Sequence, residues 1–329
     1  MIKEAPYVDV LIMTYNQENF VKDAIDSVLN QTYKNIKNII ITDDGSKDST
    51  PQIIEEYASK YPVITPILAK ENKGIAYNVN RGLKQLKSEY MSSIAGDDMM
   101  FPEKIEKQVE YLNNNQDVVV CSHDMDVFDS ITGKSLGNFS ETINYKKINK
   151  KLGVEYLFDP AINLCPSTYM FRKDAIPKKG VDTRLKLVNE LIFDVEVLMN
   201  GKLGYIDETL GMYRRHTNNI SSSDNDHKIA HFFEEFLVAY AIITYKYPEL
   251  VGLIKRARSN LYFGKVIRCI MAGNKNRAKN LSKVLIYEGD YIKGITAYLM
   301  SSIISPGLLN KLHESQYKEK VTGLFYRTV

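Results

Sequence analysis

Two pairs of adjacent carboxylates stand out in this chain of 329 residues, because each pair follows a short apolar run. Asp43 and Asp44 come directly after the run 36–42, and Asp97 and Asp98 come shortly after the run 90–95. Small molecules bind in open α/β sheets in the crevice beyond the carboxyl ends of the strands. If both runs are strands, the two pairs predict an acidic, ligand-binding cleft.

Each pair also has a plainer interpretation. Asp, Gly and Ser favour turns through local hydrogen bonds, so Asp43 and Asp44 could simply form a turn that binds no ligand. Asp97 and Asp98 could likewise simply belong to a helix-capping loop before Pro102. The occurrence of both pairs in one chain, each at a strand end, favours a ligand site.

Apolar runs that suit strands alternate with helical patterns through the first third of the chain. This order predicts an α/β fold in which a mixed, mostly parallel sheet is flanked by helices. Pro51 after Ser49 or Thr50 marks the start of one helix, because a proline at the first helical position loses no hydrogen bond. The expected strands are 8–13, 64–68, 90–94 and 118–121, and the expected helices include 20–29, 76–86 and 102–112.

The pattern changes twice further along the chain. Residues 124–151 are polar and contain glycines, which predicts a loop region over the sheet. From Asp224 to the end the chain has a helical pattern, with an apolar stripe at Phe233, Phe236, Leu237, Tyr240 and Ile243. We therefore predict a first domain over 1–223, with halves of about 1–123 and 124–223, a boundary at 221–224, and a helical region over 224–329.

Composition limits the class of protein. Hydrophobic residues make up 44% and charged residues 25%, which is typical of a soluble globular chain. A net charge of +3 is too small to indicate nucleic-acid binding. Cys121, Cys165 and Cys269 are too widely spaced for a zinc site or a disulfide framework, which favours a reducing cytoplasm. We see no signal peptide and no run of 18 apolar residues, and so expect a cytoplasmic protein.

Several segments, taken in order, resemble family 2 glycosyltransferases of the GT-A fold. They are Val10–Asn16, Ser27–Tyr33, Asp43–Thr50, Asn72–Gly74, Gly96–Asp98, Gly201–Tyr205 and Tyr213–His216. The resemblance covers about the first two thirds of the chain. It implies an inverting enzyme that moves a sugar from a UDP-sugar or dTDP-sugar to an acceptor hydroxyl with the help of Mg²⁺ or Mn²⁺.

The resemblance also implies roles for individual residues. Asp44 would accept the N3–H of a uracil or thymine ring, Tyr15 would stack on the base, and Thr14 would shape that pocket. Asp97 would ligate the cation that stabilises the diphosphate leaving group, with His216 as a further ligand. The other nucleotide-sugar contacts implied are Asn16, Asp43, Asn72, Gly74, Asp98 and Arg214.

The chain departs from the family where members often have Asp-x-Asp-Asp, because Ala95 replaces the first carboxylate. The chain also differs from the family pattern at the position of the catalytic base. Members commonly use the Asp of a Glu-Asp pair, whereas this chain has Asn189 and Glu190 at that place. Glu190 is the predicted base, and Asp194, one helical turn later, is the reserve candidate. The alternative is an acidic face on an ordinary surface helix.

The predicted function is therefore sugar transfer in the assembly of a cell-surface polysaccharide or glycolipid, with a glycan or lipid-linked glycan as acceptor. A sugar-nucleotide-binding module without turnover is the alternative, motivated by Ala95 and by the Asn189–Glu190 pair. A Rossmann-type dehydrogenase is disfavoured, since no G-x-G-x-x-G follows the first strand.

The C-terminal region is strongly basic. Lysines and arginines occur from 255 to 283 without an acid until Glu288, and the apolar stretch 295–304 follows. Three interpretations remain open from the sequence. These helices could lie on an anionic membrane surface, present a solvated basic face, or form a homo-oligomer interface.

Overall fold

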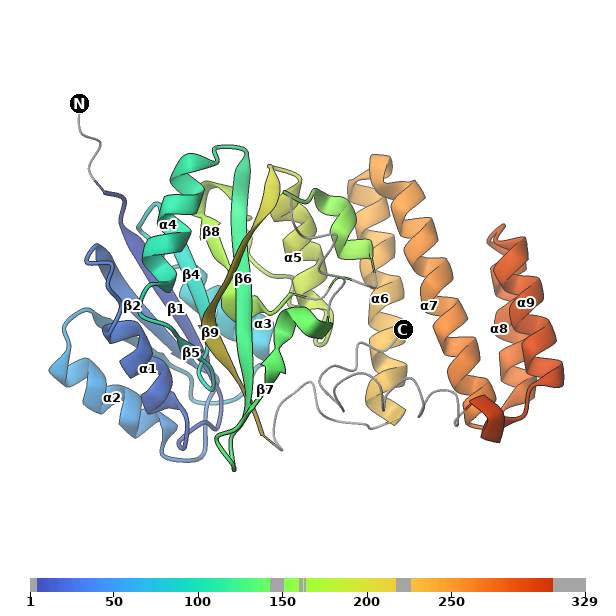
Figure 1. Ribbon diagram of the computed structural model, residues 1–329, viewed down its shortest axis with the longest axis horizontal. Helices are drawn as coiled ribbons and strands as arrows, with labels where there is room; N and C mark the ends of the chain where they lie inside the picture. Colours follow the sequence, from blue (N-terminus) through green and yellow to red (C-terminus); the bar gives the residue numbers. More distant parts are fainter. Residues whose placement is uncertain (1–4, 143–150, 160–161, 163, 217–225, 310–329) are drawn as a thin grey trace. The chain divides into compact units, whose positions relative to one another are not determined.

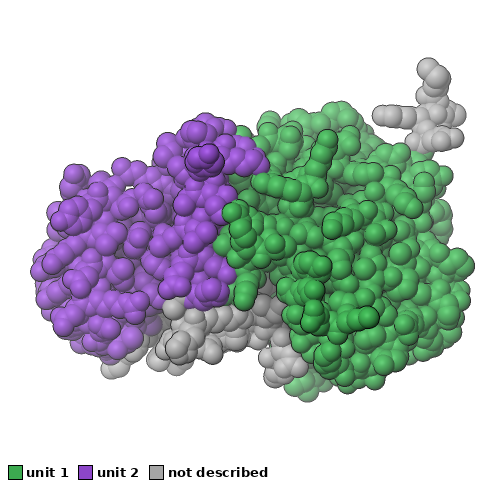
Figure 2. Space-filling view, turned by 180° about the vertical axis from the view of Figure 1, so that it is seen from behind, with its two compact units in different colours: residues 1–157, 161–217 green, residues 158–160, 218–329 purple. Residues whose placement is uncertain are grey.

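The chain folds into two units in the computed structural model, which describes residues 5–142, 151–159, 162, 164–216 and 226–309. One unit comprises residues 1–157 and 161–217, and the other comprises 158–160 and 218–329 (Figure 2). The domain boundary expected at 221–224 lies outside the described residues, so the predicted division at 223 stays a prediction.

A mixed sheet forms the centre of the first unit. Four parallel strands stand in the order β3, β2, β1, β4, with bounds Ile64–Leu68, Ile36–Asp43, Val8–Thr14 and Tyr90–Ala95 (Figure 1). The sheet continues through β8, β6, β9 and β5, with bounds Met170–Arg172, Val118–Asp129, Lys202–Arg215 and Met99–Met100. β8 pairs antiparallel with β4 and β6, whereas β6 and β9 are parallel. The predicted α/β class with a mixed, mostly parallel sheet is confirmed.

Helices cover both faces of this sheet, which explains why the strands are apolar on both sides. Val10 and Ile12 belong to a core with residues of α1, α2 and α4, whereas Leu11 and Ile40 belong to a core with residues of α3 and α5. The bounds of these helices are Val21–Leu29, Thr50–Lys60, Lys104–Asn114, Ile75–Leu83 and Asn189–Leu198.

The expected strands and helices of the first 120 residues agree with the structure to within a few residues. The prediction of a loop over 124–151 is wrong at its start, because β6 runs on to Asp129 and β7 (Ser135–Asn138) pairs with it. The polar residues there were misleading. Asp124 is buried, and its Oδ1 accepts the backbone N–H groups of Met125 and Ser140. Residues 143–150 of that prediction lie outside the described residues.

The second unit is helical in its described part, as the sequence predicts beyond Asp224. It contains α6, α7, α8 and α9, with bounds Asp226–Lys246, Val251–Met271, Lys275–Tyr287 and Tyr291–Ile303. Tyr240 and Ile243 of the expected apolar stripe are buried. Among the described residues, none of the helices combines the length and the hydropathy needed to span a bilayer.

One lysine lies inside the first unit. Lys104 of α4 is 1% exposed, and its Nζ donates to Ser92 Oγ of β4 at 2.8 Å. Burial lowers the pKa of Lys104 from 10.5 to about 7, because the charged ammonium loses its hydration. This residue therefore binds its proton less tightly in the folded chain than in the unfolded chain.

The sign of the resulting pH dependence follows from linkage. Between about pH 7 and pH 10 the unfolded chain holds a proton on Lys104 that the folded chain lacks, so stability rises with pH by up to about 1.4 kcal/mol per unit. We expect Lys104→Met to flatten the rise in melting temperature between pH 7 and pH 9. Lys22→Met, at an exposed position on α1, is the control. A slope that K104M leaves unchanged would contradict this assignment.

Candidate functional site

The parallel strands bring the two acidic pairs to one edge of the sheet. β1 lies between β2 and β4, and Thr14 at its end is in register with Asp43, while Met13 is in register with Ala95. Strands in a sheet are spaced by about 4.8 Å, so the backbones after β2 and β4 lie roughly 10 Å apart across β1. Asp44 and Asp97 thus flank the end of the same strand.

Asp43 closes the turn after β2. It is fully buried, and its Oδ1 accepts from the hydroxyls of Thr14 at 3.0 Å and Ser46 at 2.5 Å. Its Oδ2 accepts the Ser46 backbone N–H at 2.9 Å. These contacts fix the strand end, as the turn interpretation of this pair requires. The predicted contact between Asp43 and a nucleotide stays a prediction.

Asp44 ties a second loop to the same place. Its two carboxylate oxygens accept the backbone N–H groups of Lys73 at 3.0 Å and Gly74 at 2.8 Å. The loops approach closely, because a Cβ on Gly45, whose φ is 72°, would lie 2.5 Å from the carbonyl carbon of Glu71. Each carboxylate oxygen of Asp44 has a further lone pair with which it can accept another donor. Asn72 is exposed beside it.

The segment after β1 joins these loops. Asn16 adopts a positive φ of 51°, its N–H donates to Ser46 Oγ at 2.7 Å, and its Oδ1 accepts the Lys47 N–H at 2.9 Å. Asn16 is thus a link between two loops in this structure. Tyr15 is 45% exposed, so its ring is accessible to a planar ligand at the edge where Asp44 lies.

Asp97 and His216 form a direct pair. His216 Nε2 lies 2.9 Å from Asp97 Oδ2, both side chains are largely buried, and the Phe20 ring lies 4.7 Å from the imidazole. Two ligands at about 2.1 Å from an octahedral cation and at right angles to each other are about 3 Å apart. The pair is therefore spaced as two neighbouring ligands of Mg²⁺ or Mn²⁺ would be.

A cation at this pair would need ligands in addition to the side chains that the structure describes around it. The described residues contain no group of three or more His, Cys, Asp or Glu side chains that could hold a metal. Mg²⁺ commonly binds through one or two carboxylates together with water and substrate phosphates. The donor set fits such a site, in which a diphosphate would complete the coordination.

Asp98 anchors the loop that carries Asp97. It is 2% exposed, and its carboxylate accepts from Ser167 Oγ at 2.6 Å and from the Arg214 backbone N–H at 3.0 Å. Burial, and then the charge of Asp97, raise the pKa of Asp98 well above its ordinary value, against the effect of these two donors. The carboxylate contacts that the structure gives Asp98 fit the role of holding a loop. Its predicted contact with the nucleotide-sugar stays a prediction.

Arg214 joins β9 to the same loop. Its Nε donates to the carbonyl oxygen of Asp97 at 2.9 Å, and its Nη2 contacts Asp23 Oδ2 at 2.6 Å. The guanidinium lies 4.9 Å from the ring centre of Phe20 and 4.8 Å from that of Phe128. These contacts make Arg214 a brace for the loop, and its predicted contact with the nucleotide-sugar stays a prediction.

The sequence reasoning missed Asp23, Phe20, Phe128 and Ser167 at this site. Asp23 lies 191 residues before Arg214 in the chain, and no local motif connects the two. Ser167 donates to Asp98 and also accepts the backbone N–H of Ala95 at 3.1 Å. Because only the fold brings these residues together, no signal in the sequence could have identified them.

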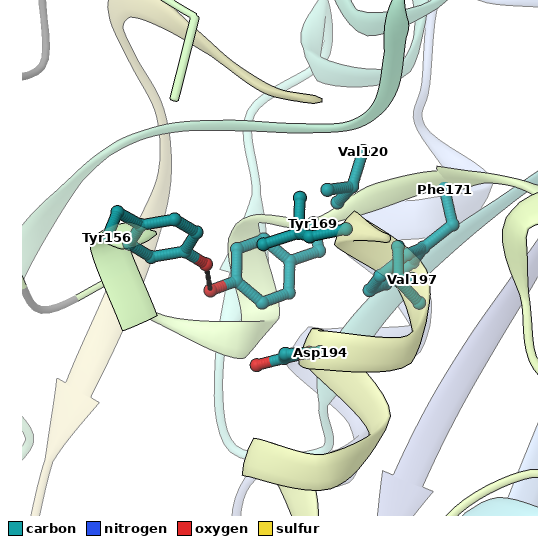
Figure 3. A pocket seen from close by; sticks show the side chains of 7 residues that line it. Val120, Tyr156, Tyr169, Phe171, Asp194 and Val197 are labelled. Carbon is teal, nitrogen blue, oxygen red and sulfur yellow. Dashed lines mark hydrogen bonds between the residues drawn. The ribbon is translucent and has the colours of Figure 1, made fainter. Parts of the chain in front are cut away.

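The two candidate bases lie on α5. Glu190 in its first turn is exposed, and Asp194 is half-buried. Burial and then Asp98 raise the pKa of the Cys165 thiol, and Glu190 adds to that effect. Asp194 lines a small pocket with Tyr156 and Tyr169, whose hydroxyl oxygens are 3.4 Å apart (Figure 3).

Comparison with known sequences supports a relationship to transferases. The model of glycosyl transferase family 2 matches residues 9–178. An uncharacterized glycosyltransferase of Rickettsia typhi is 43% identical over 124 residues, which cover 37% of this chain and 37% of that protein. One of Methanocaldococcus jannaschii is 27% identical over 266 residues, which cover 80% and 86%. The chain thus spans just over a third of the length of the R. typhi relative.

Solved structures give the fold. S. aureus TarS 1–349 has a TM-score of 0.63 at 15% identity, over 94% of this chain and 92% of that chain, and TarS has been solved with UDP and with UDP-GlcNAc. A mannosyltransferase of Pyrobaculum calidifontis, in complex with GDP-Man and Mn²⁺, has a TM-score of 0.60 at 12% identity, over 96% and 81%. The expected GT-A fold is confirmed.

The space around Gly96 offers a test of how the site is held together. A Cβ on Gly96 would lie 2.4 Å from Gln17 Oε1 and 2.6 Å from Thr14 Cγ2. We expect Gly96→Ala to lower the free energy of unfolding by about 1–3 kcal/mol, because the loop must move away from the end of β1. Denaturant unfolding measures this change.

Gly252→Ala is the matched control, since no atom lies within 4 Å of a Cβ at that position in α7. We expect G252A to be neutral or to stabilise by up to about 1 kcal/mol, as an alanine does in a helix. Equal stability of G96A and G252A would show that Gly96 is not required for close packing.

Proposed function

The chain belongs to glycosyl transferase family 2, and we propose that it transfers a sugar from a UDP-sugar or dTDP-sugar to an acceptor hydroxyl with inversion at the anomeric carbon. One observation carries this proposal: Asp44 and Asp97 lie at the ends of β2 and β4, on either side of the end of β1. A single extended donor can span that edge with its base at one side and its diphosphate at the other.

The base would bind at the Asp44 side. A carboxylate is an acceptor, and uracil and thymine each present an N3–H donor. Asp44 has its two bonds to the 72–74 loop and lone pairs left for that donor. The exposed Tyr15 would stack on the ring. The complexes of TarS with UDP and UDP-GlcNAc support a uracil base by analogy with a protein of the same fold.

The diphosphate would bind at the Asp97 side. Asp97 and His216 would hold a Mg²⁺ or Mn²⁺ ion there, and that ion supplies positive charge to the leaving group. The Mn²⁺ complex of the Pyrobaculum mannosyltransferase supports this cofactor. Asp98 and Arg214 keep the pair in place through the contacts to Ser167, Phe20 and Asp23.

Glu190 would act as the general base. As the acceptor oxygen attacks the anomeric carbon, the carboxylate of Glu190 takes the hydroxyl proton and the bond to the diphosphate breaks. Its exposure on the first turn of α5 leaves it accessible to an acceptor, whereas Asp194 is half-buried beside Tyr169. Glu190 is therefore preferred over Asp194 on accessibility.

We propose a glycan or lipid-linked glycan as the acceptor, in the assembly of a cell-surface polysaccharide or glycolipid. The second candidate function is binding of a sugar nucleotide without turnover. Ala95 favours it, because this residue stands where many members carry another carboxylate. An activity measurement that includes base variants separates the two candidates.

Nucleotide specificity can be read from thermal stability, because a ligand that binds the folded state raises the melting temperature. We expect UDP or dTDP with Mn²⁺ to raise it by several degrees at about 100 times the dissociation constant. GDP and ADP should have little effect. Stabilisation by purine nucleotides alone would refute the proposed base site.

Asp97→Asn tests the cation in the same assay. This variant should lose the additional stabilisation that Mn²⁺ gives to the UDP complex, because the amide is a much weaker ligand than the carboxylate. Asp174→Asn, on the short helical turn after β8, is the control. An undiminished effect of Mn²⁺ in D97N would exclude Asp97 as a ligand.

Turnover tests the base. Glu190→Gln should lower kcat by about 10²–10⁴-fold while UDP still stabilises the protein, because the amide cannot take the proton. Asp194→Asn should retain most activity, and Glu110→Gln, exposed on α4, is the control. If D194N and not E190Q abolishes turnover, Asp194 is the base. If the parent protein binds UDP and no sugar donor turns over, the binding-module function is favoured.

A further inference from the structure

Helix α9 of the second unit has two unlike faces. Its small residues Gly294, Ala297 and Ser301 are buried, and a Cβ on Gly294 would lie 2.5 Å from Ile286 Cγ1 of α8. α8 and α9 are adjacent helices (Figure 1). The small-residue face of α9 is thus already packed within its own unit.

The opposite face of α9 carries large aliphatic side chains. Ile292, Ile295, Leu299 and Ile303 are 83%, 53%, 52% and 77% exposed. The spacing i, i+3, i+7 and i+11 puts them in one stripe along the helix. We call these four residues the α9 stripe. Tyr291 and Tyr298 of the same helix are also exposed, as is Tyr287 at the end of α8.

Positive charge accompanies this apolar surface. Residues 251–303 contain ten lysines and arginines and two acids, Glu288 and Asp290. Both acids are paired within the unit, Glu288 with Arg258 and Asp290 with Lys293. Lys275, Lys279 and Lys283 follow one another at four-residue spacing on α8, and Lys279 Nζ lies 5.7 Å from the Tyr298 ring centre of α9. Lys279 of this row thus lies beside α9.

We propose that the α9 stripe docks on the surface of a bilayer that contains anionic lipid. Aliphatic side chains with flanking tyrosines suit the boundary between acyl chains and headgroups, and adjacent lysines suit anionic headgroups. The helix lies in the plane of the surface, because its other face is packed against α8. This arrangement brings the transferase to a surface where a lipid-linked acceptor would reside.

Charge favours a membrane over a second copy of the chain. Two copies that met through this face would bring two strongly basic helical units together, and like charges at an interface oppose association. An anionic bilayer complements the charge and takes up the apolar side chains.

Vesicle binding by the full chain tests the proposal. We expect the chain to sediment with vesicles of phosphatidylcholine and about 30 mol % phosphatidylglycerol at least about ten-fold more strongly than with phosphatidylcholine alone. The double variant Ile292→Asp and Ile303→Asp should weaken this binding by about ten-fold or more, since both side chains leave the apolar layer.

The matched control is Ile131→Asp, because Ile131 is 84% exposed on the first unit, away from α9 in the chain. I131D should bind vesicles as the parent does. Lys279→Gln with Lys283→Gln should weaken binding to anionic vesicles and reduce its dependence on salt, because fewer charges contact the headgroups. Melting temperatures of all variants should stay close to that of the parent.

Three results would overturn the proposal. They are equal vesicle binding by I292D/I303D and the parent, equal binding to neutral and anionic vesicles, and a concentration-dependent dimer that I292D/I303D dissociates in gel filtration. The last result would assign the α9 stripe to a second copy. The vesicle assay needs no nucleotide or metal. A negative result would therefore refute membrane docking without bearing on the proposed transfer reaction, and an inactive chain could still bind vesicles.

Discussion

The candidate site depends on the parallel pairing of β1 with β2 on one side and with β4 on the other. Parallel strands place all their carboxyl ends at one edge, so Asp44, Thr14 and Asp97 must lie together although they are far apart in the chain. Helices on both faces of the sheet leave the strand ends as the open edge. The three strands are largely buried up to that edge, where Asp43, Asp44, Asp97 and Asp98 follow at or just after the ends of β2 and β4.

Buried polar contacts then fix the loops at the edge. Asp43 closes the turn after β2, Asp44 holds the 72–74 loop, and Asp98 holds the loop that carries Asp97. Burying a carboxylate is costly unless it accepts hydrogen bonds, and each of these three does. Asp43 and Asp98 thus hold loops, whereas Asp44, Asp97 with His216 and the exposed Tyr15 are the groups that we propose contact a ligand.

The second unit presents a different kind of surface. Helix α9 packs through small residues and keeps large aliphatic side chains outside, next to the lysine-bearing helix α8. A purely solvated helix would carry polar residues on that side. The combination of apolar stripe and positive charge is the reason that we propose a membrane surface as its partner.

Periodicity and composition were sufficient to predict the α/β class, the strands and helices of the first 120 residues and the helical C-terminal region, because apolar spacing reflects local burial. The motifs identified the family, which the comparison with its model confirms. The extension of β6 to Asp129 could not be predicted, since the burial of Asp124 depends on partners from elsewhere in the fold. The brace formed by Arg214 with Phe20, Asp23 and Phe128 could also not be predicted, because these residues lie far apart in the sequence and meet only in the folded unit. The sequence by itself determined the fold class, the family and the candidate residues for which we propose chemistry. Only the tertiary structure decided which of those candidates anchor loops and which are accessible, because hydrogen-bond partners distant in the chain are brought together only by packing.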